Sequence, residues 1–282
     1  MRVAYLGPPG TFNDDALRSA VGDVEVDAVA AATVHDAIVA VESGKVDRAL
    51  VPFENSLEGS VRATLDTLVL EAGSVTIVGE HDLPIRHSLI AREGIPFERV
   101  EAVLSHPQAT AQCARFIRER LPRAEVRAAP STADAVRQVA ESSEPWAALG
   151  AESAARMYGC SVLAEGVEDD PDNETRFVWI APQGTGSSGE GAWRTTLVFS
   201  ELGADRPGAL VEALLEFSDR EVNLTRIESR PLRRGLGRYM FFIDLEGAVD
   251  DPKVAEAIER LRDKAESVRI LGSYPVRGHG VP

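Results

Sequence analysis

Apolar residues in the first part of the chain form short runs that alternate with longer amphipathic stretches. The short runs are typical of buried strands and lie at 2–6, 24–29, 48–51, 75–78, 100–104, 126–129, 146–149 and 177–180. Apolar positions at helical spacing predict helices between them, at 14–20, 34–43, 109–120 and 133–142. Strands that alternate with helices predict a mostly parallel sheet covered on both faces. Ligands of such sheets bind beyond the carboxyl ends of the strands.

A polar segment at 183–191 interrupts this pattern. It is rich in glycine and serine and has no large apolar residue, which favours a flexible linker over a long surface loop. The elements that follow have another order, with strands expected at 195–199, 222–229, 239–245 and 268–273 and helices opened by Pro207-Gly208 and Asp251-Pro252. This βαββαβ order is that of a ferredoxin-like unit.

Composition and charge exclude several classes of function. Hydrophobic residues make up 44% and charged residues 27%, as in an ordinary globular protein. The net charge of −15 argues against nucleic-acid binding, which needs a basic surface. The two cysteines, Cys113 and Cys160, have no CxxC partner, so we expect neither a disulfide nor a zinc site. No signal-peptide core and no membrane-length run occurs, so we expect a cytoplasmic protein without membrane contact.

Polar turns follow several predicted strands. Residues 7–13 lead into a helix start, whose free N–H groups attract anions, although a turn with Thr11 or Asn13 as a simple helix cap is the commoner explanation of such a segment. Asn55 follows another strand, in a turn that an ordinary capped loop would also explain. Ser105 and Gln112 flank a third turn, where His106 is either a general base or a histidine bonded to its own loop.

The segment 172–177 leads into the last strand of this region. Arg176 offers a guanidinium fork suited to a carboxylate, although other exposed turns of this composition look similar. The sequence contains no metal-ligand cluster, no Walker loop and no dinucleotide fingerprint. We therefore expect no metal and no cofactor.

The order of these motifs is more specific than any single motif. GPPGTFN, VPFENSLEGSV, LPIRHSL, SHPQATAQC, STADAV and DNETRF succeed one another as in the prephenate dehydratase family, and GALVEAL and NLTRIESRP resemble its regulatory ACT domain. The resemblance extends from residue 3 to about 274, and Asn13 departs from the Ser or Thr of many relatives. It implies a two-lobed α/β catalytic region like the type 2 periplasmic binding proteins, with the site between the lobes, and a C-terminal ferredoxin-like ACT domain.

Domain boundaries follow from the resemblance. The catalytic domain is expected at 1–182, with lobe one at about 1–78 and 163–182 and lobe two at about 79–162. A linker at 183–193 and the ACT domain at 194–275 complete the chain.

The implied reaction converts prephenate to phenylpyruvate with loss of water and CO2. The matched motifs imply a catalytic role for Thr175 and substrate binding by Thr11, Asn55, Ser105, Gln112, Arg176 and Phe177. Hydroxide is a poor leaving group, so Thr175 is assigned as a hydrogen-bond donor or proton relay to the C4 hydroxyl. Arg176 and the helix start after Thr11 are the expected holders of the pyruvyl carboxylate.

The resemblance also implies regulation by L-phenylalanine bound between two ACT domains, and hence a homodimer or homotetramer. The implied contacts are Gly208, Ala209, Leu210, Asn223, Leu224, Glu228, Ser229, Arg230 and Pro231, unless these residues only build an interface. Two alternatives stay open for the function: an arogenate dehydratase and a non-catalytic amino-acid sensor.

Overall fold

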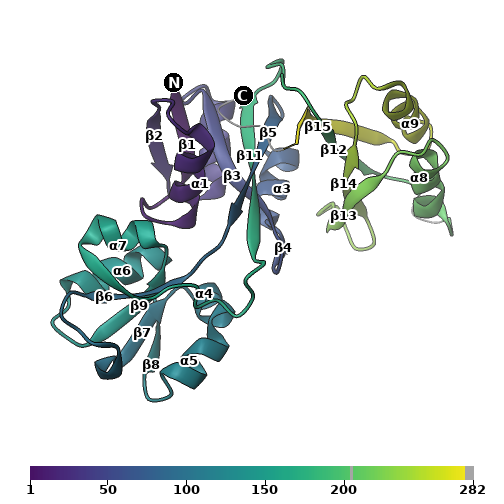
Figure 1. Cartoon of the computed structure of the whole chain (residues 1–282). Coiled ribbons are helices and arrows are strands. Elements are labelled where there is room, and N and C mark those ends of the chain that lie inside the picture. The colour runs from purple at the N-terminus through teal and green to yellow at the C-terminus, as the bar shows by residue number, and fades with distance from the viewer. Residues whose placement is uncertain (204–205, 277–282) are drawn as a thin grey trace.

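The computed structural model describes residues 1–203 and 206–276, which form three units. Figure 1 shows lobe one at the upper left, lobe two below it and the C-terminal unit beside lobe one. No helix in these described ranges is long and apolar enough to cross a bilayer. The predicted α/β fold, with two lobes and a separate C-terminal unit, is confirmed.

Lobe one is built on the sheet order β5-β11-β3-β1-β2. Its strands are β1 (Arg2–Leu6), β2 (Asp27–Ala31), β3 (Arg48–Asn55), β4 (Gly59–Ser60), β5 (Val75–Pro84) and β11 (Glu174–Pro182), and its helices are α1 (Phe12–Val21), α2 (Val34–Glu42) and α3 (Arg62–Leu70). Strands β1, β2 and β3 are parallel, whereas β11 is antiparallel to β3 and β5. The sheet is therefore mixed, because β5 carries the chain towards lobe two and β11 brings it back.

Lobe two has its own sheet, with the order β10-β6-β9-β7-β8. Its elements are β6 (Ser88–Arg92), a short 3-10 helix (Phe97–Arg99), β7 (Ala102–Ser105), α4 (Pro107–Gln112), α5 (Ala114–Arg120), β8 (Glu125–Ala128), α6 (Thr132–Glu141), β9 (Trp146–Gly150), α7 (Glu152–Tyr158) and β10 (Cys160–Ala164). Strands β6 and β10 and helix α7 were not predicted, and the helix expected at 109–120 is divided at Cys113.

The crossings between the lobes lie a few residues later than the sequence indicated. Strand β5 stays in the sheet of lobe one as far as Pro84, because β11 pairs with it along its length. On the return path, β10 pairs with β6 as far as Ala164, so this strand belongs to lobe two.

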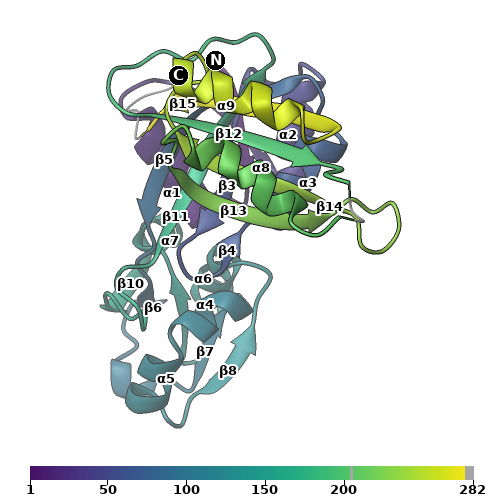
Figure 2. The ribbon, with the colours of Figure 1, turned by 90° about the vertical axis from the view of Figure 1, so that its right-hand side faces the viewer.

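The C-terminal unit has the predicted βαββαβ order. It comprises β12 (Trp193–Ser200), α8 (Ala209–Ser218), β13 (Leu224–Pro231), β14 (Tyr239–Glu246), α9 (Pro252–Arg262) and β15 (Ser267–Pro275), with the antiparallel sheet order β13-β14-β12-β15. Helices α8 and α9 cover one face of this sheet, and the view of Figure 2 looks onto them.

The other face of that sheet packs on lobe one. Val198, Met240, Phe242 and Tyr274 share a single apolar cluster with core residues of lobe one such as Phe53. At one point the two sheets also meet edge to edge, where Gly272 of β15 pairs with Ile77 of β5. A Cβ atom at Gly272 would overlap the Ile77 carbonyl oxygen, so this approach requires glycine. The C-terminal unit is thus docked on lobe one, not merely tethered to it.

Candidate active site

A cavity of about 570 Å³ lies between lobe one and lobe two. Lobe one contributes the turns that follow β1 and β2 and the ends of β3 and β11, and lobe two contributes the turns that follow β7 and β8. The site thus lies beyond the carboxyl ends of parallel strands, where open α/β sheets bind ligands. Among the predicted site residues, the cavity is lined by Thr11, Asn55, Gln112, Thr175 and Phe177.

Thr175 and Asn55 form a fixed pair at the floor of this cavity. They are opposite each other in the register of β11 and β3, and Asn55 Nδ2 donates to Thr175 Oγ1 at 3.0 Å. The orientation of the Asn55 amide is determined independently, because its Oδ1 accepts the backbone N–H groups of Leu57 and Glu58, both at 3.0 Å. Nδ2 must therefore face Thr175, whose oxygen accepts. Among the described residues no acceptor holds the Thr175 hydroxyl proton, so it can be donated to a ligand.

A chain of hydrogen bonds continues from this pair into lobe two. Asn55 Nδ2 also donates to Asn173 Oδ1 at 2.8 Å, and Asn173 Nδ2 donates to Gln112 Oε1 at 3.3 Å. His87 Nε2 lies 3.0 Å from the same Gln112 oxygen. Burial lowers the pKa of His87, against smaller opposing effects of Gln112 and Glu168, so the neutral ring is favoured. The network holds the two lobes together across the cavity.

Asn173 and His87 were missed as site residues in the sequence. Asn173 is 1% exposed and belongs to the same DNETRF motif as Thr175, and that proximity was the available signal. His87 belongs to the LPIRHSL motif, directly before β6, and it lines the cavity. Its ring contacts Phe12 edge-on, with the ring centroids 5.0 Å apart.

Among the described residues, no lysine or arginine lines the cavity, and its one lining carboxylate, Asp134, pairs with Arg137 at 3.1 Å. Any attraction for an anion must therefore come from backbone groups. Helix α1 from lobe one and α6 from lobe two, each of 10 residues, begin at its wall. Thr11 precedes α1 but does not cap it, since its Oγ1 donates to the Pro8 carbonyl at 2.9 Å. The first N–H groups of α1 and the helix dipole remain available to an anion.

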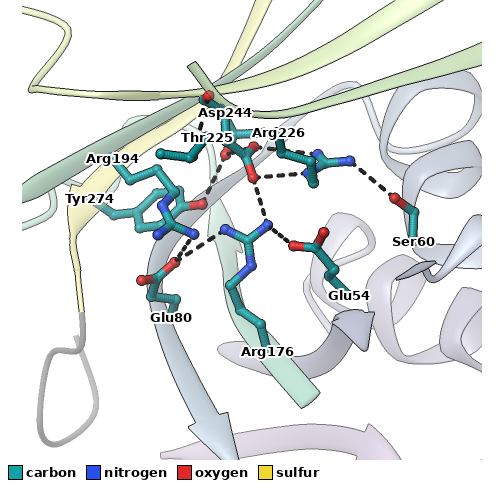
Figure 3. Close-up of polar contacts among 10 residues, drawn as sticks. Glu54, Ser60, Glu80, Arg176, Arg194, Thr225, Arg226, Asp244 and Tyr274 are labelled. Carbon is teal, nitrogen blue, oxygen red and sulfur yellow. Dashed lines mark hydrogen bonds and ion pairs between the residues drawn. The ribbon is translucent and has the colours of Figure 1, made fainter. Parts of the chain in front are cut away.

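The structure corrects the assignment of Arg176 to the substrate. Successive side chains of a strand point to opposite faces, so Thr175 and Phe177 face the cavity and Arg176 faces the C-terminal unit. There its NH2 group lies 2.8 Å from Glu54 and 2.6 Å from Asp244 (Figure 3). Burial would lower the pKa of Arg176, but Asp244, Tyr274 and Glu54 together outweigh burial and raise that pKa, so the guanidinium is charged.

Ser105 also lies outside the cavity lining. It is fully buried at the end of β7, and its Oγ donates to the Leu149 carbonyl at 2.8 Å, which fastens β7 to β9. The hydroxyl predicted to contact the substrate is instead bonded to the backbone of β9. His106 lines the cavity and accepts the Gln108 N–H through Nδ1 at 3.3 Å, which is the loop bond considered for it.

The C-terminal unit has a second cavity, of about 840 Å³. Of the predicted effector residues, Gly208, Ala209 and Leu210 line it, at the start of α8. Asn223, Leu224 and the 228–231 segment lie outside this lining. Arg230 is held by Asp66 of α3, with 2.7 Å between Arg230 NH2 and Asp66 Oδ2.

The fold and the site define a class of protein: a two-lobed α/β enzyme with a cavity between its lobes and a ferredoxin-like unit docked on one lobe. The sequence model of the prephenate dehydratase family matches residues 3–185, and that of the ACT domain matches residues 195–263. The chain belongs to the prephenate dehydratase family. It is a decarboxylating lyase with an ACT domain at its C-terminal end.

Individual relatives agree with this family. A prephenate dehydratase of Mycobacteroides abscessus is 43% identical over 288 residues, which cover 100% of this chain and 92% of the relative. A crystal structure of prephenate dehydratase from Arthrobacter aurescens in complex with L-Phe is 37% identical, with a TM-score of 0.90 and coverage of 100% and 92%. A solved structure described as GqqA, a quorum quenching acylase, is 31% identical, with a TM-score of 0.85 and coverage of 98% of each chain.

Proposed function

We propose that prephenate binds in the cavity between the lobes and that the Thr175 hydroxyl donates a hydrogen bond to its departing C4 hydroxyl. The observation that carries this proposal is the orientation of Asn55, which leaves the Thr175 proton free to point at a ligand. In the reaction the C4–O bond breaks, the ring carboxylate leaves as CO2, and its electron pair completes the aromatic ring. Hydroxide leaves as water and the reaction takes up a proton, so Thr175 serves as donor and relay and not as the ultimate proton source.

The two carboxylates of prephenate need different treatment. Strong binding of the departing carboxylate would stabilise the ground state and slow decarboxylation. A cavity without lysine or arginine side chains in its described lining is suited to this requirement. The start of α1 holds the pyruvyl carboxylate, Asn55 and Gln112 orient the polar groups, and Phe177 packs on the ring.

Thr175→Ala and Thr175→Ser test the catalytic assignment. Thr175→Ala loses most of the turnover, by about 10²-fold or more, with a smaller change in KM, because it removes the donor at the leaving group. Thr175→Ser keeps the hydroxyl and recovers much of the rate. Initial rates are followed by phenylpyruvate absorbance, and a Thr175→Ala enzyme with near-normal kcat would remove Thr175 from the mechanism.

We also propose that the ACT domain binds L-phenylalanine as an effector and that the cytoplasmic enzyme is a homodimer or homotetramer. The Arthrobacter relative was crystallised with L-Phe. In this chain the cavity beside Gly208 supports an effector site there, and Asn223, Leu224, Glu228, Ser229 and Pro231 complete it at an interface with a second copy. Val211 and Leu215 on α8 and Ile227 on β13 are exposed apolar residues, as a subunit interface requires.

Gly208→Val tests the effector site. Gly208 has a φ of 86° directly before α8, so a β-branched residue there is strained and projects towards the proposed ligand. We expect the half-inhibitory concentration of phenylalanine to rise by about tenfold or more. Gly44→Val is the matched control, because Gly44 has a φ of 68° in lobe one, far along the chain from this cavity. Calorimetry measures binding directly, and sedimentation with and without phenylalanine gives the oligomeric state.

Arogenate dehydration and a purely sensory role were the two alternatives from the sequence, and membership of the prephenate dehydratase family argues against the second. Arogenate carries an amino group where prephenate has a keto group, and parallel kinetics on both compounds distinguish these substrates. A sensor would bind phenylalanine but yield no phenylpyruvate from prephenate.

A further inference from the structure

Six charged side chains meet where the ACT domain docks on lobe one. The three cations and three anions alternate in a buried crevice: Arg176, Glu54 and Glu80 from lobe one, and Arg194, Arg226 and Asp244 from the ACT domain (Figure 3). The ring of Phe53 lies beneath two of the guanidiniums, with its centroid 5.1 Å from Arg176 Cζ and 4.8 Å from Arg226 Cζ.

Asp244 is the centre of this charged cluster. It is 0% exposed, and its Oδ2 accepts from Arg176 NH2 at 2.6 Å and from Arg226 Nε at 2.9 Å. Its Oδ1 accepts from Thr196 Oγ1 at 2.8 Å. A buried charge is stable only when its partners are in place, so Asp244 restricts Arg176 to one position relative to the ACT sheet.

Arg176 in turn belongs to one of two consecutive cross-strand pairs. Arg176 lies opposite Glu54 and Thr175 lies opposite Asn55, on the same two strands, β11 and β3. The first pair faces the ACT domain and the second faces the cavity, because alternate residues of a strand point to opposite sides. The register with β3 shifts directly after Arg176, which sets these two pairs apart from the rest of that ladder, whereas the register with β5 is unbroken from Glu174 to Trp179. The position of Thr175 therefore depends on the side-chain contacts of its neighbour.

Strand β14 relates this cluster to the ACT cavity. Tyr239 and Phe241 line that cavity, whereas Met240, Phe242 and Asp244 alternate with them and face lobe one. One strand thus has the proposed effector cavity on one side and the contact with Arg176 on the other.

We propose that Asp244, a residue of the ACT domain, is a positioning residue for the dehydration, because it holds Arg176 and thereby sets the register at which Thr175 meets the substrate. The proposal rests on the proposed role of Thr175. A change in the ACT domain that separates Asp244 from Arg176 displaces the Thr175 hydroxyl. The groups that hold the substrate carboxylate, at the start of α1, lie outside this contact, so the change affects kcat and not KM.

Asp244→Asn tests the proposal, because it keeps the shape and removes the charge. We expect kcat to fall by about tenfold or more, since a misplacement near 1 Å can cost up to 10²-fold, while KM changes little. Asp66→Asn is the matched control. Asp66 also joins the ACT domain to lobe one, through Arg230 at 2.7 Å and Arg233 at 2.6 Å, but it lies on α3 and not beside Thr175. Asp66→Asn should leave kcat within about twofold of the wild type.

A double-variant cycle separates positioning from general weakening of the interface. If Asp244 acts through Arg176, then Arg176→Gln combined with Asp244→Asn costs no more kcat than the worse single variant. If the two losses of kcat add up in the double variant, Asp244 does not act through Arg176. An equal loss of kcat in Asp66→Asn would overturn the positioning role as well.

Thr196→Val and Arg176→Lys test the positioning role of Asp244 if the Asp244→Asn variant does not fold. Each weakens the hold on Asp244 or Arg176 without leaving a buried charge unpaired, and each should lower kcat with a nearly unchanged KM. Folded variants with kcat within about twofold of the wild type would refute the positioning role. If Thr175→Ala stops turnover but these variants do not, only the positioning role of Asp244 fails. If Thr175→Ala is active, the proposed chemistry itself fails.

Discussion

Strands β3 and β11 separate two polar regions that use opposite physical means. On one face, the active-site cavity is lined by hydroxyls, amides and helix starts, without arginine or lysine in its described part. On the other face, the crevice against the ACT domain concentrates three arginines with five carboxylates. The ion pairs between arginines and carboxylates at this contact thus serve domain docking. Neutral donors in defined orientations serve the chemistry, where a permanent cation would hold a departing carboxylate too firmly.

The two regions also differ in how their hydrogen bonds are satisfied. Asp244 has its bonds completed by Thr196, Arg176 and Arg226. Burial would raise its pKa, but Arg226 and Arg176 outweigh burial and hold that pKa below its usual range. Thr175, by contrast, keeps a hydroxyl proton without an acceptor in the described chain. At the permanent contact with the ACT domain, the carboxylate of Asp244 has all its hydrogen-bond partners within the protein. In the cavity, the Thr175 hydroxyl still has a proton to donate to a substrate.

The largest expected effect comes from placing a carboxylate beside Thr175 in the active-site cavity. Asn55→Asp is nearly isosteric, but its carboxylate would accept the Thr175 proton and repel the substrate dianion. We expect kcat/KM to fall by about 10²- to 10³-fold, as when a positioned donor is lost. Gln183→Glu makes the same chemical change on an exposed loop and should leave kcat/KM unchanged. An active Asn55→Asp enzyme would show that the cavity does not depend on neutral groups.

A smaller effect is expected from the docking side. Arg269 of β15 donates to the carbonyl oxygens of Leu68 and Ala72, both at 2.8 Å, and so closes the C-terminal end of α3. Arg269→Gln should lower the free energy of unfolding by about 1–3 kcal/mol, because it leaves these carbonyls without their charged donor. Lys253→Gln is the comparison: it removes an exposed ion pair with Glu221, which solvent screens, and should change the free energy of unfolding much less. Denaturant-induced unfolding of both variants measures these losses. Equal losses of unfolding free energy would show that Arg269 contributes no more than an exposed ion pair.

The smallest expected effect concerns pH and His87. Burial lowers the pKa of His87 from 6.5, so the folded state disfavours the proton that the unfolded state accepts. This contribution to stability is complete above pH 6.5 and is lost as the pH falls through the lower folded value. His87→Gln, which cannot titrate, should show a shallower decline of the thermal midpoint below pH 6.5. Parallel slopes for the two proteins would exclude His87 as a source of the decline.

Several errors in the prediction from sequence have identifiable causes. The alternation of a strand already implies that Thr175 and Arg176 face opposite sides, but the affinity of guanidinium for carboxylates outweighed it. Ser105 was assigned wrongly for another reason: the hydroxyl of a polar residue at a strand end can donate to a neighbouring backbone carbonyl instead of to a ligand. Strands β6 and β10 and helix α7 are short, and no strong periodicity distinguishes them from loops.

The order of most elements, the βαββαβ unit, the family and the motif that contains Thr175 could all be predicted from the sequence. These depend on local periodicity and on residues close together in the chain. Only the tertiary structure decided that Asn55 meets Thr175, 120 residues away, and that Asp244 holds Arg176 from 68 residues away. Such contacts depend on strand register and on the docking of one sheet against another. No local pattern encodes either, because both are set by how distant apolar faces pack together.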